Sequence, residues 1–101
     1  MSRDSMDVLT SHSAEEIRTY CYDLAQELEI TLGDACWGYT FAPAHTHAPY
    51  HLMLTLTQLR KTTLAFWFTR AQVLGYGSDT TKTAIRIQIR DALETRLRDG
   101  R

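Results

Sequence analysis

The sequence is poor in the features that mark several classes of protein. Its 101 residues include 2 cysteines, Cys21 and Cys36, in no Cys-x-x-Cys pattern; this excludes a disulfide scaffold and indicates buried thiols in a reducing compartment. No apolar run approaches the roughly 20 residues that a membrane-spanning helix needs. The opening residues lack the basic start and apolar stretch of a secretory signal, so we expect a cytoplasmic protein that makes no contact with a membrane.

Acidic residues are absent from the middle of the chain. None occurs between Asp34 and Asp79, a stretch that holds most of the aromatic residues and three of the 4 histidines. Residues 1–34 carry a net charge of −6 and residues 35–101 carry +5, although the whole chain carries −1. The basic, aromatic part is suited to an anionic partner such as a nucleic acid. Alternatively, the two oppositely charged parts neutralise each other within the fold.

The composition that remains is that of an ordinary globular domain. Apolar residues make up 44% and charged residues 23% of the chain, which argues against long disorder. A chain of this length can bury a single hydrophobic core. We expect a flexible N-terminal tail over residues 1–12, where no periodic pattern occurs, and one domain over residues 13–101.

The first regular pattern is that of a helix. Apolar residues recur at helical intervals over residues 14–31. Ser13 and Glu16 have the spacing of a capping box, in which each side chain binds a free backbone amide of the first turn. Gly33 is the expected end of this helix, because glycine readily terminates helices.

Three runs of alternating apolar and polar residues follow, and each predicts a half-buried strand. The connections between them are a loop bounded by prolines and a short turn at 59–62. Such short connections favour an antiparallel meander. The predicted strands cover residues 37–41, 51–57 and 63–69.

The last segment of the chain fits two patterns. Isoleucines at alternate positions predict a strand over 83–90. The same isoleucines share one helical face with apolar residues as far as Leu97, which is beyond the length of the alternating run. We therefore expect a helix over 79–98, with Ser78 or Asp79 as its N-cap.

The predicted order of elements is α-β-β-β-α, a two-layer fold of the α+β class. Both helices must bury an apolar stripe, so we expect them on one face of a three-stranded antiparallel sheet. The opposite face would display threonines, Met53, Trp67 and His51. Large side chains exposed in this way are suited to partner contacts, for which the candidates are Trp67, Met53 and Trp37. Alternatively, a loop or a second copy of the chain covers Trp67.

Three histidines lie close together in and after the predicted loop. His45 and His47 face the same side of an extended segment, and His51 follows, so the three are candidate metal ligands. No acidic residue lies near them to orient their imidazoles. Neither cysteine is tied to a histidine and no nucleophile or phosphate-loop motif occurs, so we expect no enzymatic activity, cofactor or metal. A metal enzyme built on these histidines is the remote alternative.

A glycine turn precedes the second predicted helix. Gly75-Tyr76-Gly77 leads into a helix start, where free backbone amides and the helix dipole attract anions. Lys82, Arg86 and Arg90 recur every four residues and would form one basic ridge on this helix. Alternatively, the turn caps a helix whose charged face is simply solvated.

These features together resemble the double-stranded-RNA-binding domain. That family has the same order of elements, a histidine near a proline in the loop between its first two strands, and a glycine turn before a basic helix. His47-Ala48-Pro49 matches the loop, and Gly75 to Lys82-Thr83-Ala84 matches the turn and helix start. The resemblance spans residues 13–98. It implies that His47 approaches a minor groove and that Lys82 contacts the phosphates across the major groove.

The sequence thus predicts a binding module with two alternative kinds of partner. One is RNA or another polyanion. The other is a protein, in which case the chain is an inhibitor, an adaptor or a homodimer that uses the aromatic sheet face or the acidic first helix. The near-neutral net charge favours a protein partner. A polyanion would contact basic side chains of the loop, the strand turn and the last helix, namely His47, Arg60, Lys61, Lys82, Arg86 and Arg90.

Overall fold

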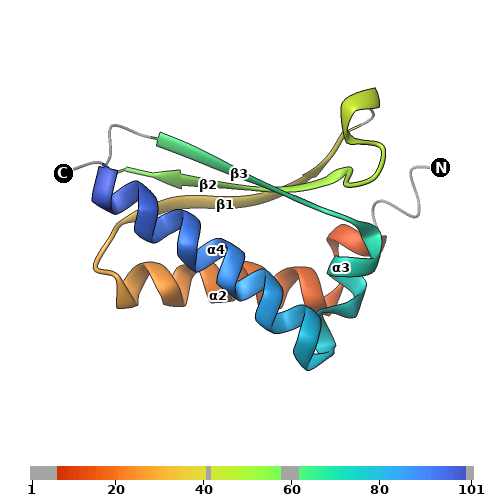
Figure 1. The fold of residues 1–101 in the computed structure, drawn as a ribbon, viewed down its shortest axis with the longest axis horizontal. Helices are drawn as coiled ribbons and strands as arrows, with labels where there is room; N and C mark the ends of the chain where they lie inside the picture. Colours follow the sequence, from red (N-terminus) through yellow and green to blue (C-terminus); the bar gives the residue numbers. More distant parts are fainter. Residues whose placement is uncertain (1–6, 41, 58–61, 100–101) are drawn as a thin grey trace.

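The computed structural model of the chain describes residues 7–40, 42–57 and 62–99, and it confirms the predicted α+β architecture. Three antiparallel strands form one sheet, and the long helices near the two ends of the chain lie on the same face of it (Figure 1). 3-10 turns occur at Pro43–His45 and Gly75–Gly77. The helices and strands are α2 (His12–Glu27), β1 (Leu32–Tyr39), β2 (Tyr50–Leu56), β3 (Thr62–Phe68), α3 (Arg70–Leu74) and α4 (Asp79–Asp99).

The sheet has the order β1-β2-β3, as a meander requires. Its register places Leu52 of β2 between Trp37 of β1 and Phe66 of β3. Because side chains alternate between the faces of a strand, this register turns the leucines of β2 and the phenylalanines of β3 toward the helices. The three predicted strands are confirmed, although β1 begins at Leu32, before its predicted start at 37, and ends at Tyr39. Thr40 is outside the strand, and residue 41 lies outside the described residues.

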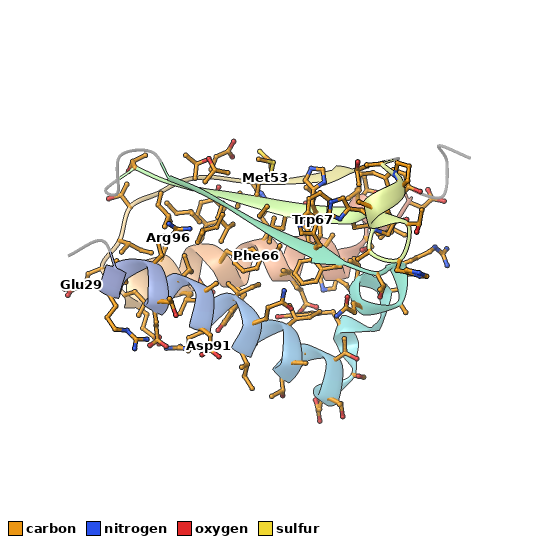
Figure 2. The ribbon with its side chains drawn as sticks, turned by 45° about the horizontal axis from the view of Figure 1, so that its top comes forward. Glu29, Met53, Phe66, Trp67, Asp91 and Arg96 are labelled. Atoms are coloured by element: carbon orange, nitrogen blue, oxygen red, sulfur yellow. The ribbon has the colours of Figure 1, made fainter. Side chains whose placement is uncertain are left out.

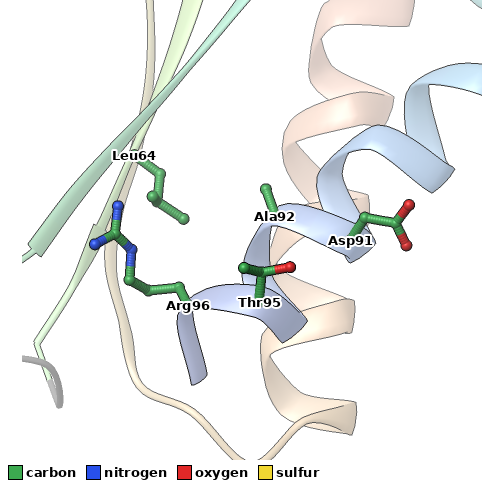
Figure 3. A pocket seen from close by; sticks show the side chains of 5 residues that line it. All are labelled: Leu64, Asp91, Ala92, Thr95 and Arg96. Carbon is green, nitrogen blue, oxygen red and sulfur yellow. The ribbon is translucent and has the colours of Figure 1, made fainter. Parts of the chain in front are cut away.

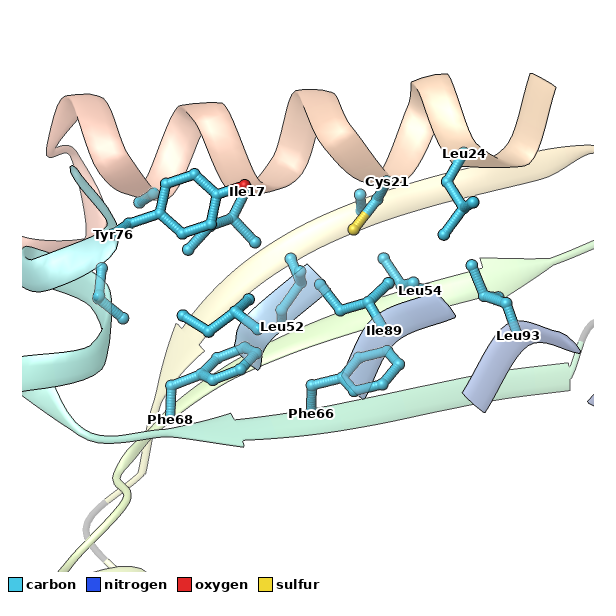
Figure 4. Close-up of a cluster of buried hydrophobic side chains, with 14 of the residues drawn as sticks. Ile17, Cys21, Leu24, Leu52, Leu54, Phe66, Phe68, Tyr76, Ile89 and Leu93 are labelled. Atoms are coloured by element: carbon cyan, nitrogen blue, oxygen red, sulfur yellow. The ribbon is translucent and has the colours of Figure 1, made fainter. Parts of the chain in front are cut away.

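The hydrophobic core fills the space between the sheet and the helices (Figure 4). Tyr76, from the turn before α4, is also fully buried there. Side chains from both long helices and from β2 and β3 interlock in one cluster, so neither layer can be removed without exposing the other. Its members with 0–4% exposure include Ile17, Cys21, Leu24, Leu52, Leu54, Phe66, Phe68, Ile89 and Leu93.

Helix α2 begins and ends earlier than its sequence pattern predicts. Its N-cap is Ser11, whose Oγ accepts a hydrogen bond from the Ala14 amide at 3.2 Å, so the predicted capping box of Ser13 is wrong. The helix ends at Glu27, and Glu29 adopts φ 58°. The Ile30 amide then donates to the Ala25 carbonyl at 2.9 Å, and this closing bond places Ile30 in the core without a glycine.

The packed part of the chain begins before residue 13, where the predicted domain boundary lay. Residues 7–9 are helical, and Val8 is completely buried among the core residues. The Ser11 amide donates to the Val8 carbonyl at 3.1 Å, which connects this turn to the start of α2. Residues 7–9 of the predicted tail thus pack onto the domain through Val8, which buries its side chain in the core.

The last segment is a helix, as its length predicts. Ser78 caps α4 by accepting a hydrogen bond from the Thr81 amide at 3.2 Å. Ile85 and Ile89 are buried, whereas Ile87 lies off the apolar stripe and is 54% exposed. No described helix is both long and apolar enough to cross a membrane.

Helix α3 is an element that the sequence pattern did not predict. Thr69 and Gln72 form a reciprocal capping box at its start, with hydrogen bonds of 2.8 and 3.0 Å. The helix buries Val73 and carries the chain from the end of β3 to the glycine turn. A single helical turn is too short to produce a periodic signal, which is why only the capping residues could have indicated it.

Candidate partner-binding surface

The face of the sheet turned away from the helices, here called the outer face, is open. Figure 2 shows Met53 and Trp67 on this side of the sheet, while Phe66 points toward the helices. Among its described residues, Asp34 is the only acidic or basic group apart from histidine. By strand register the outer face comprises Asp34, Cys36, Gly38, His51, Met53, Thr55, Thr63, Ala65 and Trp67.

The centre of the outer face is a row of three small or flexible side chains. Cys36, Met53 and Ala65 are neighbours across β1, β2 and β3. All three are exposed, and Met53 has 40% of its surface accessible, which agrees with its predicted exposure. The three side chains themselves carry no charge that a docking protein would have to desolvate, and on one side they are flanked by Asp34, Thr55 and Thr63.

One end of the outer face is closed by an aromatic cluster. The loop after β1 folds back so that the His45 ring stacks on Trp67, with centroids 3.7 Å apart and planes at 8°. His51 lies against the same indole at 5.0 Å. Trp67 is consequently half-buried, and the alternative that a loop covers it describes the structure better than a freely exposed indole does.

Gly38 makes room for this cluster. A Cβ at this position would lie 2.3 Å from Nε2 of His51, so the imidazole occupies the space that any other side chain would need. His51 Nδ1 is buried and has no hydrogen-bond partner among the described atoms. Burial, with a smaller contribution from His45, lowers the pKa of His51, and the ring is therefore neutral near pH 7.

Trp37 is not part of the outer face, contrary to its assignment as a partner-contact candidate. It pairs with Leu52, which turns its side chain toward the helices. Its Nε1 donates a hydrogen bond to the Ala14 carbonyl at 2.9 Å, and its ring contacts Phe68 at 5.7 Å. Trp37 therefore joins α2 to the sheet, which is a structural role.

The two cysteines have opposite environments, so the expectation that both thiols are buried is wrong for one of them. Cys21 faces the core, and burial raises the pKa of its thiol to about 12. Cys36 is exposed on the outer face, where its Sγ donates to Oδ2 of Asp34 at 2.9 Å. This hydrogen bond raises the pKa of Cys36, with burial and the Asp34 charge adding to it, and keeps the thiol protonated.

The loop histidines do not assemble a metal site in the described part of the chain. No group of three histidine, cysteine, aspartate or glutamate side chains there is placed to hold a metal ion. His45 and His51 instead both pack against Trp67, whereas His47 is exposed to solvent. Two of the three candidate ligands thus belong to the aromatic cluster.

The cations of α4 are engaged differently from one another. Arg90 pairs with Glu27 of α2 and approaches Glu94 at 4.0 Å. Arg86 donates from Nε to the Tyr76 hydroxyl at 2.7 Å and lies over the Tyr20 ring at 4.7 Å. Lys82 lies 5.5 Å from the centre of the Tyr76 ring. They form a row on α4, but their contacts are with tyrosines and with the acidic helix α2.

Carboxylates of α2 lie near two members of the basic row, Arg86 and Arg90. Arg86 shares a surface depression of about 340 Å³ with Glu15, Glu16 and Asp23. These charges oppose the approach of phosphate to the arginine. Among the described residues, one ion pair, Arg90–Glu27, joins the acidic and basic parts of the sequence. Arg60 and Lys61, also predicted to contact a polyanion, lie outside the described residues.

Comparison with known proteins identifies no relative. No protein-family model, no curated protein and no solved structure matches the chain. The resemblance to the double-stranded-RNA-binding domain therefore stays a prediction from the sequence. Two features of the surface were missed at that level, the stacking of His45 on Trp67 and the packing of His51 on Gly38. A glycine within an alternating strand was the available signal for such a close approach.

Proposed function

We propose that the protein is a binding module that docks a partner protein on the outer face of its sheet. The observation that carries this proposal is the exposed, uncharged row of Cys36, Met53 and Ala65. Protein interfaces have centres depleted in charge and enriched in methionine and aromatic residues, and Trp67 borders this row on β3, two residues from Ala65. The helices already bury the opposite face of the sheet, so the outer face is the side left for a partner.

The size of the outer face suits a transient complex. Three strands of this length present roughly 300 Å². A stable interface needs about 800 Å² on each partner, so an obligate homodimer would require contacts well beyond the sheet. An adaptor or inhibitor that binds reversibly fits the available area, with the rim of the interface extending over the loop that carries His45.

A pair of matched charge insertions tests the proposal. Met53→Lys places a charge at the centre of the outer face, and Ile87→Lys places the same charge on α4, where Ile87 is also exposed. Each variant, with the wild type, is immobilised and used to recover binding proteins from an extract of the cells that make the chain. We expect Ile87→Lys to recover the same partner as the wild type and Met53→Lys to recover about tenfold less.

The comparison requires that both variants have the same thermal unfolding midpoint as the wild type. We expect this because substitutions at exposed positions change stability little. Equal recovery by Met53→Lys and the wild type would reject the outer face as the docking surface. Loss of the partner by Ile87→Lys alone would move the site to α4.

Polyanion binding is the second candidate. The observation in its favour is that Lys82 and Arg86 make no ion pair with a carboxylate in the part of the chain that the structure describes. A gel-shift titration with generic duplex RNA, at low and high salt, tests it with the variant Lys82→Gln/Arg86→Gln. Binding that falls steeply with salt and is lost in the variant supports this candidate, because phosphate contacts release counterions. Absence of a shift at low salt rejects it.

A further inference from the structure

The two edges of the sheet are protected to different degrees. On β1, the Ala35 carbonyl accepts a hydrogen bond from Nε of Arg18 at 2.8 Å, and the Ala35 amide donates to Oδ1 of Asp34 at 2.9 Å. The pairing of β1 with β2 is also irregular between Leu32 and Asp34. Side chains that occupy backbone groups and bulges that bend a strand both prevent another strand from pairing. The β1 edge is therefore closed.

In the part of the chain that the structure describes, the β3 edge has none of these protections. Thr62–Phe68 contains no charged residue and no proline, and its pairing with β2 is regular throughout. Within the described residues, no side chain hydrogen-bonds to a backbone group of β3. The outward amides and carbonyls of such an edge form a template to which an extended chain can add.

A groove runs beside this open edge (Figure 3). It has a volume of about 460 Å³ and lies between β3 and the C-terminal half of α4. Leu64 and Ala92 are half-buried and give it an apolar floor, while Thr95 is exposed at its side. A strand added to β3 would turn alternate side chains into this groove, because side chains alternate between the two faces of a strand.

The charges of the groove determine at which end of an added strand an acidic side chain is favoured. Arg96 reaches from α4 toward β3 (Figure 3), and it makes no ion pair with any residue that the structure describes. Asp91 lies at the other end of the lining. An acidic side chain of an added strand would thus be attracted at Arg96 and repelled at Asp91.

We propose that the β3 edge and its groove bind an extended peptide segment of another protein by strand addition. The segment has an apolar side chain that faces Leu64 and Ala92, and a carboxylate that pairs with Arg96. Backbone hydrogen bonds to β3 supply the affinity, and the groove supplies the selection of side chains. This site is separate from the outer face and does not depend on the function proposed above.

A peptide library tests the strand-addition site. Its members are capped peptides of alternating threonine and valine with aspartate, glutamate, asparagine or lysine at the last position, and binding to the purified chain is measured by fluorescence anisotropy. We expect the aspartate and glutamate members to bind about tenfold more tightly than the asparagine members. Arg96→Glu should reverse the preference in favour of lysine. In the complex, amide hydrogen exchange should slow in β3 and stay unchanged in β1.

Two tryptophan variants provide the matched control. Thr95→Trp fills the groove and should abolish binding, whereas Thr83→Trp, at an exposed position near the start of α4, should bind as the wild type does. Failure of every library member to bind the wild type overturns the proposal, as does unchanged binding by Thr95→Trp. A doubled mass in light scattering that Thr95→Trp returns to the monomer value would also overturn it, since a second copy would then occupy the edge.

Discussion

At the level of single residues, the outer face is defined by the strand side chains that point out of the sheet and by the loop side chain, His45, that stacks on one of them. The alternation of apolar and polar residues correctly assigns Met53 to the outer face and Leu52 to the core. It cannot assign a loop side chain, because a loop has no period, and so the stacking of His45 on Trp67 could not be predicted. Trp37 is predicted as a partner contact because of its size, but its register with Leu52 of β2 turns it toward the helices.

The packing of His51 on Gly38 gives the first prediction. Gly38→Ala should force the His51 ring away from Trp67, because the new methyl group would lie 2.3 Å from Nε2 of the imidazole. We expect a loss of roughly 1–2 kcal/mol in the free energy of unfolding, measured by urea denaturation. Gly77→Ala is the control: nothing lies within 4 Å of a Cβ there, and its stability should equal or slightly exceed that of the wild type. Equal stability of both variants would contradict this packing.

The contrast between the two thiols gives the second prediction. Iodoacetamide should modify one thiol of the folded chain, Cys36, and two after unfolding, because Cys21 is buried. The hydrogen bond and charge of Asp34 raise the pKa of Cys36 and so reduce its reactive thiolate fraction near pH 7. Asp34→Asn should lower that pKa and accelerate alkylation, while Asp91→Asn, distant on α4, should not. A slower reaction of Asp34→Asn would contradict the assigned interaction.

At the scale of elements, length separated the two interpretations of the last segment. The alternating isoleucines span too few residues to account for the apolar face that continues to Leu93 and beyond, and α4 is indeed a helix. The bounds of α2 were less predictable because two serines, Ser11 and Ser13, precede its apolar stripe. Its end depends on a local hydrogen bond from the Ile30 amide to the Ala25 carbonyl. Glu29 takes the left-handed conformation that glycine usually adopts at this point, so no glycine marks the end of the helix.

The two serines give the third prediction. Ser11→Ala should cost about 1 kcal/mol of unfolding free energy, because the Ala14 amide then loses its hydrogen-bond acceptor. Ser13→Ala should be neutral or slightly stabilising, since Ser13 lies inside α2 and alanine has the higher helix propensity. Thermal denaturation of both variants checks the order. A larger loss of stability in Ser13→Ala than in Ser11→Ala would indicate that Ser13 is the N-cap, as the sequence pattern predicts.

At the level of the whole molecule, the fold brings charges that are far apart in the sequence close together. The acidic helix α2 and helix α4, which carries the row of cations, lie on the same face of the sheet (Figure 1), and Arg90 of α4 pairs with Glu27 of α2. The sequence shows how many acidic and basic residues each part of the chain has. Only the packing of α4 beside α2 determines which of them pair with each other and which remain available to a partner. The layer architecture was predictable from hydrophobic patterns, whereas the partner surface required the register and the loop.

The central claim is that a partner protein docks on the row of Cys36, Met53 and Ala65. Cys36 allows a direct measurement, because this exposed thiol can carry a benzophenone maleimide while Cys21 stays unlabelled. The labelled chain is illuminated in an extract of the cells that make it, with excess unlabelled wild type or Met53→Lys as competitor. We expect one specific cross-linked protein, whose yield falls with the wild-type competitor and not with Met53→Lys. Equal competition by the two chains would contradict it.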